Sequence, residues 1–193
     1  MKTLCVLCHP SRGSLSAHLA DHTVAYLRAR GHDVILSDLY AEGYDPCLSA
    51  AEKDAYHTPP YVDTAELQGI EALVMIFPTW WSGMPAKLKG WVDRSFLPGV
   101  AFDVDAATGA LHPRLMQLQQ VLVITTLGGP AWIDRLVLRR PLYRVLKWGL
   151  LKPCAPKAQF RMLSLYGAET ITEARLTLFT RRITRQINKW GHP

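Results

Sequence analysis

The stretch TLCVLC at residues 3–8, followed directly by HPSRGSLS at residues 9–16, decides the fold of this 193-residue chain. The first run is apolar and has the length of a buried strand, and residues 14–30 then carry apolar side chains at helical spacing. Gly31 ends that helix, because glycine readily takes the backbone conformation found after a helix C-terminus. A strand followed by a helix is a βα unit, so the sequence predicts an α/β fold with a parallel sheet.

The same alternation continues along the chain. Four further apolar runs are typical of buried strands: residues 33–36, 72–77, 121–126 and 160–165. Three further amphipathic segments predict helices: residues 85–96, about 132–148 and a last one with apolar residues from 171 to 187. Ser82 is expected near the N-cap of the second helix. Residues 40–60 and 97–118 are rich in turn signals and are expected to be long loops over one edge.

Length and composition favour one domain that spans residues 1–193, since 49% of the residues are hydrophobic and 20% are charged. We expect no signal peptide, because His9 and Pro10 interrupt the first apolar run. The longest apolar run, residues 72–77, is far shorter than the roughly 20 residues of a membrane-spanning helix, which predicts a soluble protein without membrane insertion. The scattered cysteines, described next, favour a cytoplasmic location.

Cys5 and Cys8 form a C-x-x-C pattern, which is found in redox pairs and zinc sites. Both lie in the first expected strand, where side chains three residues apart point to opposite faces. We therefore expect neither a disulfide nor a metal site, and the scattered Cys47 and Cys154 favour a reducing compartment.

The formal net charge of +6 predicts attraction to anions. Two groups of basic residues recur at helical spacing: Arg135, Arg139, Arg140, Arg144 and Lys147, and Arg181, Arg182, Arg185 and Lys189. A solvated helix face is the simplest interpretation of each group, and contact with a dinucleotide phosphate or a partner subunit is the alternative.

The first strand end offers a phosphate site. In a parallel sheet, ligands bind at the carboxyl ends of the strands, and here His9 and three serines run directly into a helix N-terminus. The exposed amides and the positive end of the helix dipole favour an anion. Serines that serve only as helix caps would give the same pattern.

The third and fourth strand ends suit a flat heterocycle. Residues 77–85 read FPTWWSGMP, and two tryptophans with exposed backbone around them can contact a planar ring, although two buried core tryptophans are the alternative. Residues 125–130 read TTLGGP, where glycines allow close approach to the backbone, but an ordinary turn would have the same sequence.

Together, HPxxxSLS at residues 9–16, FPTWWSGMPAKLKGWVDRSF at residues 77–96 and TTLGGP at residues 125–130 resemble the NAD(P)H:quinone oxidoreductase family of flavodoxin-like proteins. The stretches SDLY at residues 37–40 and YDP at residues 44–46 are similar to the same family, and the resemblance covers residues 1–130. It implies a flavodoxin-like three-layer αβα sandwich whose five-stranded parallel sheet has the order 2-1-3-4-5.

The resemblance also implies roles for individual residues. The flavin phosphates would be held by His9, Ser14, Leu15 and Ser16. The isoalloxazine ring would be lined by Pro78, Thr79, Trp80, Trp81 and Ser82, and its pyrimidine edge by Thr125, Thr126, Gly128 and Gly129, with Leu127 as an extra residue relative to the family's TTGG. The substrate pocket would be walled by Trp81 and Trp132.

One departure from animal-type members concerns catalysis. Those proteins follow the glycines with a Tyr and a His that assist hydride transfer, whereas this chain has AWIDR at residues 131–135. No catalytic acid or base is therefore assigned.

The implied activity is two-electron reduction of quinones or similar electrophiles by NADH or NADPH, in a ping-pong cycle. FAD is preferred slightly over FMN, the chain is expected to form a homodimer with the site at the subunit boundary, and no nucleic-acid partner is expected. Two alternatives remain. A flavodoxin-type electron carrier is disfavoured because such proteins are typically acidic, and a regulatory oxidoreductase subunit of a potassium-efflux system, with an antiporter as partner, stays open.

Overall fold

The computed structural model describes residues 1–59, 61 and 65–191. Five strands form one parallel sheet: β1 (Lys2–Leu7), β2 (Asp33–Asp38), β3 (Ala72–Pro78), β6 (Gln120–Leu127) and β7 (Gln159–Tyr166). Their order is β2-β1-β3-β6-β7, which confirms the expected order 2-1-3-4-5. Strand β3 is apolar and buried throughout, and β6 is buried except at Leu127, because helices cover both faces of a parallel sheet.

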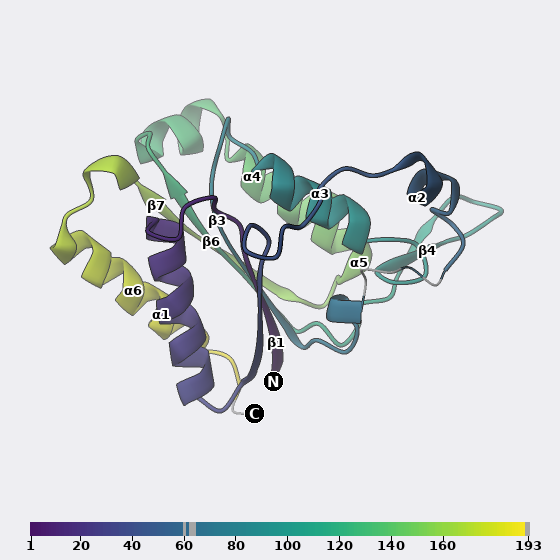
Figure 1. Cartoon of the computed structure of the whole chain (residues 1–193), viewed down its shortest axis with the longest axis horizontal. Coiled ribbons are helices and arrows are strands. Elements are labelled where there is room, and N and C mark those ends of the chain that lie inside the picture. The colour runs from purple at the N-terminus through teal and green to yellow at the C-terminus, as the bar shows by residue number, and fades with distance from the viewer. Residues whose placement is uncertain (60, 62–64, 192–193) are drawn as a thin grey trace.

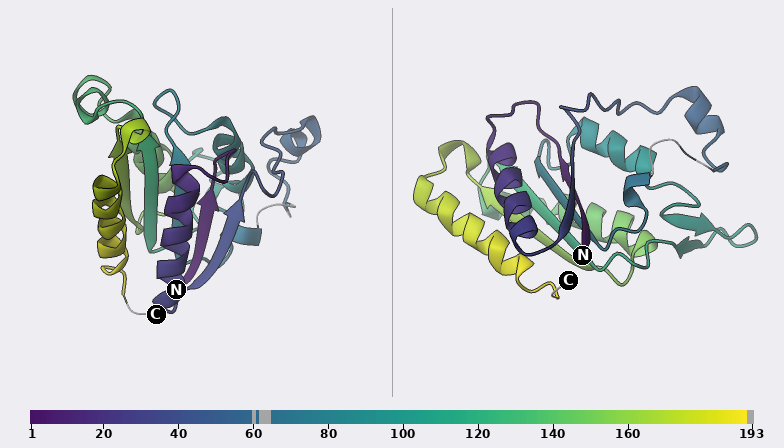
Figure 2. Two further views of the ribbon diagram at one scale, coloured as in Figure 1. Left: turned by 60° about the vertical axis from the view of Figure 1, so that its left-hand side comes forward. Right: turned by 60° about the horizontal axis from the view of Figure 1, so that its bottom comes forward.

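Helices cover the sheet in two layers (Figures 1 and 2). On one face lie α1 (Leu15–Ala29) and α6 (Glu173–Ile187), and on the other lie α3 (Ala86–Ser95) and the helical segment from α4 (Pro141–Arg144) to α5 (Lys152–Cys154). Each layer has its own apolar core. Cys5 belongs to the core under α1 and α6, whereas Cys8 belongs to the opposite core, which confirms that the two thiols face apart.

The helix expected at residues 132–148 is interrupted, so the prediction of one continuous helix was wrong. Ile133–Val137 form a π-helical turn, Arg139 and Arg140 have φ values of 57° and 54°, and a second helical run begins at Pro141 and includes the π-helical Val145–Leu151. The break has a local cause, because proline disfavours the α conformation at the residue before it. The helical spacing of the basic residues therefore spans two separate segments.

The two long loops contain short regular elements that composition alone did not predict. Residues 40–60 include α2 (Ala50–Asp54), and residues 97–118 include the antiparallel pair β4 (Phe102–Val104) and β5 (Leu111–Pro113). Both lie at the end of the molecule away from α1 and α6 (Figure 1). Two 3-10 turns, Ala65–Leu67 and Ala168–Thr170, complete the elements of the described chain.

Several helix ends differ from expectation by a few residues. The N-cap of α3 is Pro85 rather than a residue near Ser82, and α6 begins at Glu173 because the Thr172 side chain accepts a hydrogen bond from the Arg175 amide. Within the described residues, no helix combines the length and the apolar character needed to cross a membrane.

Candidate functional site

The first loop connects β1 to α1 and is closed by its own hydrogen bonds. The Ser11 amide donates to Nδ1 of His9 at 3.0 Å, and the Ser14 amide donates to the Ser11 carbonyl at 3.2 Å. Ser14 is the N-cap of α1, since its Oγ accepts from the Ala17 amide at 3.1 Å, and Ser16 is buried. The capping role predicted as the simpler alternative for the serines is thus real for Ser14. The Leu15 and Ser16 amides of the first helical turn have no intrahelical acceptor and remain suited to an anion, whereas the Ala17 amide is taken by the cap.

The loop after β3, here called the third loop, is tied to the end of β6, the fourth strand of the parallel sheet, by two contacts of Thr79. Its amide donates to the Thr126 carbonyl at 2.8 Å, and its hydroxyl lies 2.6 Å from that of Thr125. Thr125 and Thr126 are themselves buried, and Pro78 is buried at the end of β3. These contacts fix the two strand ends relative to each other.

Beyond Thr79 the chain makes a tight turn that exposes a tryptophan. The amides of Trp80 and Gly83 each donate to the carbonyl of the other residue, and between them Trp81 and Ser82 have φ values of 48° and 60°. Left-handed backbone is unfavourable for a bulky side chain and often occurs at functional sites. Trp81 is fully exposed and Trp80 is 42% exposed, so the alternative of two core tryptophans is excluded.

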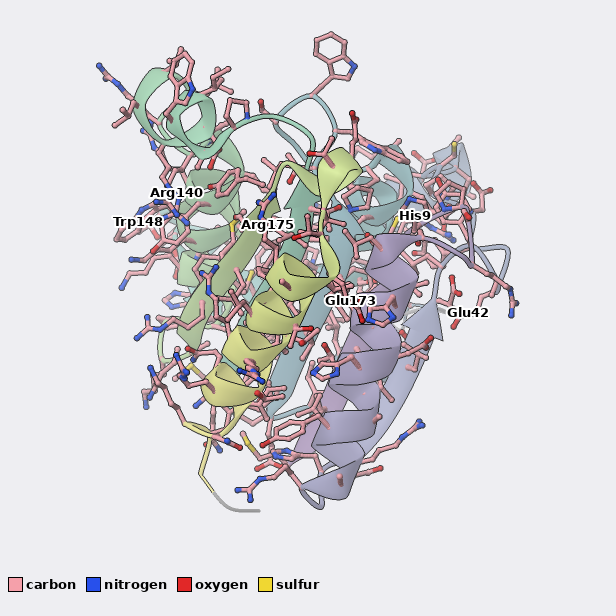
Figure 3. The ribbon with its side chains drawn as sticks, turned by 90° about the vertical axis from the view of Figure 1, so that its left-hand side faces the viewer. His9, Glu42, Arg140, Trp148, Glu173 and Arg175 are labelled. Atoms are coloured by element: carbon pink, nitrogen blue, oxygen red, sulfur yellow. The ribbon has the colours of Figure 1, made fainter. Side chains whose placement is uncertain are left out.

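A hollow of about 450 Å³ lies where the third loop meets the loop after β6, here called the fourth loop. Its lining combines Thr79, Trp81 and Ser82 with Leu127, Gly128, Gly129 and Pro130, and with Ile133, Asp134 and Leu138 of the following segment. Trp132 is 58% exposed and is not among the lining residues. The first loop also lies outside the lining, but the His9 ring, at the start of α1 in Figure 3, is centred 6.4 Å from the Trp80 ring.

One lining residue, Asp134, is held by a side chain from another element, and the sequence reasoning did not find this pair. The Tyr166 hydroxyl donates to Oδ2 of Asp134 at 2.6 Å. Arg175 in turn donates to the Tyr166 carbonyl at 2.7 Å, and the Arg135 guanidinium lies 5.5 Å from the Tyr166 ring centroid. Only the placement of Tyr166 at a strand end, on the same edge as the three loops, could have signalled this cluster.

Two further features limit the chemistry of the site. A Cβ on Gly128 would lie 3.0 Å from Oε1 of Glu169, so the absence of a side chain lets the two segments approach.

Burial raises the pKa of the Cys8 thiol, beside His9, to about 11. Cys8 therefore stays protonated near neutral pH and does not act as a nucleophile.

The residues present fit a flavin. The volume of the hollow lies within the usual range of ligand pockets, about 300–1,000 Å³. Glycine backbone and the hydroxyls of Thr79 and Ser82 surround it, while the positive end of the α1 dipole lies at the neighbouring strand end.

Comparison with known proteins defines the class. Residues 1–147 match the model of a family described as having the flavodoxin-like fold. The chain therefore belongs to this flavodoxin-like family.

Particular relatives agree with the quinone-reductase resemblance of the motifs. The uncharacterized NAD(P)H oxidoreductase YcaK of Escherichia coli is 33% identical over 104 residues, which are 50% of this chain and 53% of that protein. The ribosyldihydronicotinamide dehydrogenase [quinone] of Pongo abelii is 31% identical over 154 residues, which are 67% of this chain and 64% of that protein. The matched stretches thus span between about half and two thirds of these relatives.

Two solved structures are similar over nearly the whole chain. Smu.1420 from Streptococcus mutans has a TM-score of 0.83 at 28% identity and covers 98% of this chain and 100% of its own. An NAD(P)H:quinone oxidoreductase from Methanothermobacter marburgensis has a TM-score of 0.83 at 23% identity, covers 100% and 99%, and supports the fold.

Proposed function

We propose that the chain is a flavin-dependent NAD(P)H:quinone oxidoreductase. The observation that carries this proposal is the hollow of about 450 Å³ between the third and fourth strand ends. Its glycines and hydroxyls match the flavin-contacting motifs of the family that the sequence resembles. A bound flavin supplies the hydride chemistry, accepting two electrons from a nicotinamide and passing them to an acceptor.

The chain's own residues then bind and orient. The amides of the first turn of α1 hold the phosphates together with Ser16, and His9 keeps the loop closed through Ser11. Gly128 and Gly129 allow backbone amides to approach the ring edge and stabilise negative charge there. Asp134, held by the Tyr166 hydroxyl, offers a hydrogen-bond acceptor to a substrate in the hollow.

The first experiment identifies the cofactor. The purified protein is expected to be yellow, with one flavin per chain, and we favour FAD on the resemblance of the motifs to the quinone reductases. Reconstitution with a mixture of FAD and FMN, followed by mass spectrometry of the released cofactor, tests the choice. Recovery of FMN alone contradicts the preference for FAD, and a chain that retains neither flavin contradicts the proposed function.

Ser14→Asp separates phosphate binding from helix capping. Aspartate caps a helix as well as serine does, so the apoprotein should keep its melting temperature. Its charge repels the flavin phosphates, so the flavin Kd should rise at least tenfold, whereas Ser14→Thr should stay close to the parent. Unchanged flavin affinity in Ser14→Asp would remove the first loop from the site.

The acceptor class is tested by steady-state kinetics with a short-chain quinone. A single pocket used in turn by nicotinamide and quinone predicts ping-pong kinetics, that is, parallel lines in double-reciprocal plots at several quinone concentrations. Intersecting lines contradict this order of events. NADH and NADPH are compared by kcat/KM in the same assay.

The proposal includes a homodimer. Exposed apolar residues gather on the segment that borders the hollow: Trp132 (58% exposed), Leu136 (74%), Val137 (59%) and Leu138 (44%). Several exposed apolar residues on one segment are typical of a protein–protein contact. A second copy covering it would close the open side of the hollow.

A further inference from the structure

The charge of this chain is divided sharply along the sequence. Residues 135–189 contain thirteen Lys or Arg and two acidic residues, whereas residues 1–134 contain nine Lys or Arg and fourteen acidic residues. The net charge of +6 is therefore the sum of an acidic part and a much more basic one. Where the fold places such a basic part on one side of the molecule, that side attracts anionic partners.

The fold gathers the basic part around one sheet edge. Among the described strands, β7 is at the edge of the sheet next to β6, and it is flanked by the α4–α5 segment on one face and by α6 on the other. Figure 3 looks at this side, with Arg140 and Trp148 on the first segment and Arg175 near the start of α6. Among residues 1–59, 61 and 65–191, no ion pair joins any of these thirteen cations to a carboxylate.

One hollow on this side combines cations with an exposed indole. It has a volume of about 280 Å³ and is lined by Lys147, Lys152, Arg161 and Trp148, above apolar residues that include Phe160. Trp148 is 57% exposed, and the Lys147 ammonium lies 4.7 Å from its ring centroid. No acidic residue is among the lining.

A second hollow lies on the other side of β7. Its volume is about 310 Å³, and its lining includes Arg175, Arg182 and Leu178, which is 59% exposed. Ser164 also lines it, and its buried hydroxyl has no hydrogen-bond partner within the part of the chain that the structure describes. Both flanks of β7 thus present the same combination of cations and one large exposed apolar side chain.

We propose that this β7-edge surface, made of Lys147, Trp148, Lys152, Arg161, Leu178 and Arg182, docks peripherally on an anionic lipid bilayer. Its cations contact lipid phosphates, and Trp148 and Leu178 enter the boundary between headgroups and acyl chains, where amphipathic and aromatic side chains are favoured. The proposal does not depend on the oxidoreductase function.

Other occupants agree less well with these observations. A symmetric contact between two copies would bring the same cations face to face, which is repulsive. A nucleic acid would satisfy the charge but would leave the exposed aliphatic side chain of Leu178 without an apolar partner.

The test is co-sedimentation of the full chain with vesicles. We expect binding to phosphatidylglycerol–phosphatidylcholine vesicles at low salt, weaker binding at 0.5 M salt, and none to phosphatidylcholine alone.

The variant Lys147→Gln/Lys152→Gln/Arg161→Gln should lower the partition coefficient roughly 100-fold, and Trp148→Ala should lower it at unchanged charge. The control Arg28→Gln/Lys53→Gln/Lys89→Gln removes the same charge from the acidic part and should bind like the parent. Circular dichroism and melting temperature verify that each variant is folded.

Three results would overturn the proposal. Equal loss in the control variant would show that only the net charge matters. Loss of RNA binding in the triple variant, with vesicle binding absent from the parent, would assign the surface to a nucleic acid. Conversion of a dimer to a monomer by Trp148→Ala, again without vesicle binding in the parent, would assign it to a subunit contact. Each result is read without an activity assay.

Discussion

Trp81 combines full exposure with a left-handed backbone, and both features follow from the turn that it occupies. Two central residues with positive φ form a turn that usually contains Asn and Gly, because these residues adopt this backbone with little strain. A tryptophan at such a position is held out into solvent next to the hollow. Its ring therefore contributes to whatever closes over the hollow rather than to the core.

Trp81→Ala is expected to lower quinone turnover by about 100-fold through loss of positioning. The exposed ring adds little to stability, so the free energy of unfolding should change by less than about 0.5 kcal/mol. The pH dependence of turnover should be unchanged, because an indole does not titrate near neutral pH. Trp81→Phe should recover much of the rate. Full activity in both variants, with flavin bound, would show that the ring has no role.

The sequence predicted which backbone segments come together at the site better than which side chains form hydrogen bonds there. Thr79, Ser82, Gly128 and Gly129 follow strands directly, so the parallel sheet alone brings them to one edge. The Asp134–Tyr166 hydrogen bond joins a residue of the π-helical Ile133–Val137 to the last residue of β7. No periodicity in the sequence reports such a contact.

Helix α3 and the long loop after β2 touch through a glycine. A Cβ added to Gly90 in the middle of α3 would overlap the backbone of Pro46. Glycine normally weakens a helix, so its presence here is explained by this close approach.

Gly90→Ala is accordingly expected to destabilise the protein by about 1–3 kcal/mol, although the same change usually stabilises an exposed helix by nearly 1 kcal/mol. The control is Gly149→Ala, since a Cβ there meets nothing within 4 Å. Urea unfolding of both variants gives the comparison. A Gly90→Ala variant as stable as the control would contradict the close approach of the loop.

Helix α2 is anchored to α3 through Glu52. Hydrogen bonds from the Ser49 side chain and amide, together with Arg94 on α3, lower the pKa of Glu52 to about 2. A carboxylate whose pKa is lower in the folded state stabilises the fold above its ordinary pKa, about 4.5, and loses this contribution as the pH falls toward 2.

Glu52→Gln should therefore lower the melting temperature at pH 7, and its difference from the parent should shrink steadily between pH 4.5 and pH 2. Melting curves across this range test the linkage. Asp54→Asn, an exposed change on the same helix, controls for the loss of one negative charge. A difference that is independent of pH would refute the anchoring role of the carboxylate.

At the level of elements, strands were predicted more reliably than the segments between them. The five apolar runs all became strands of the sheet, because burial on both faces leaves a continuous apolar signal. The helix break before Pro141 and the start of α2 at the Ser49–Glu52 capping box each have a local sequence signal, which the periodicity of apolar residues does not contain. The short strands β4 and β5 have no apolar run of their own, because neither is buried on both faces.

The assembly of the whole molecule gives the next prediction. Leu136→Asp/Val137→Asp places charges on the exposed apolar patch beside the hollow and should convert the expected dimer into a monomer. Val104→Asp, at a residue 44% exposed in β4, is the control and should leave the mass unchanged. Light scattering coupled to size-exclusion chromatography measures both. A parent chain that is monomeric at micromolar concentration would contradict the dimer.

The strand order also determines how long the first strand stays partly unpaired during synthesis. Strand β1 lies between β2 and β3, and its residues pair with β3 partners about seventy positions later, such as Thr3 with Ala72. The first strand to be synthesised therefore waits with one open edge until the chain has emerged as far as Pro78. During that interval an apolar segment with unpaired amides is exposed, which is the state that nascent-chain chaperones shield and that promotes aggregation when they are scarce.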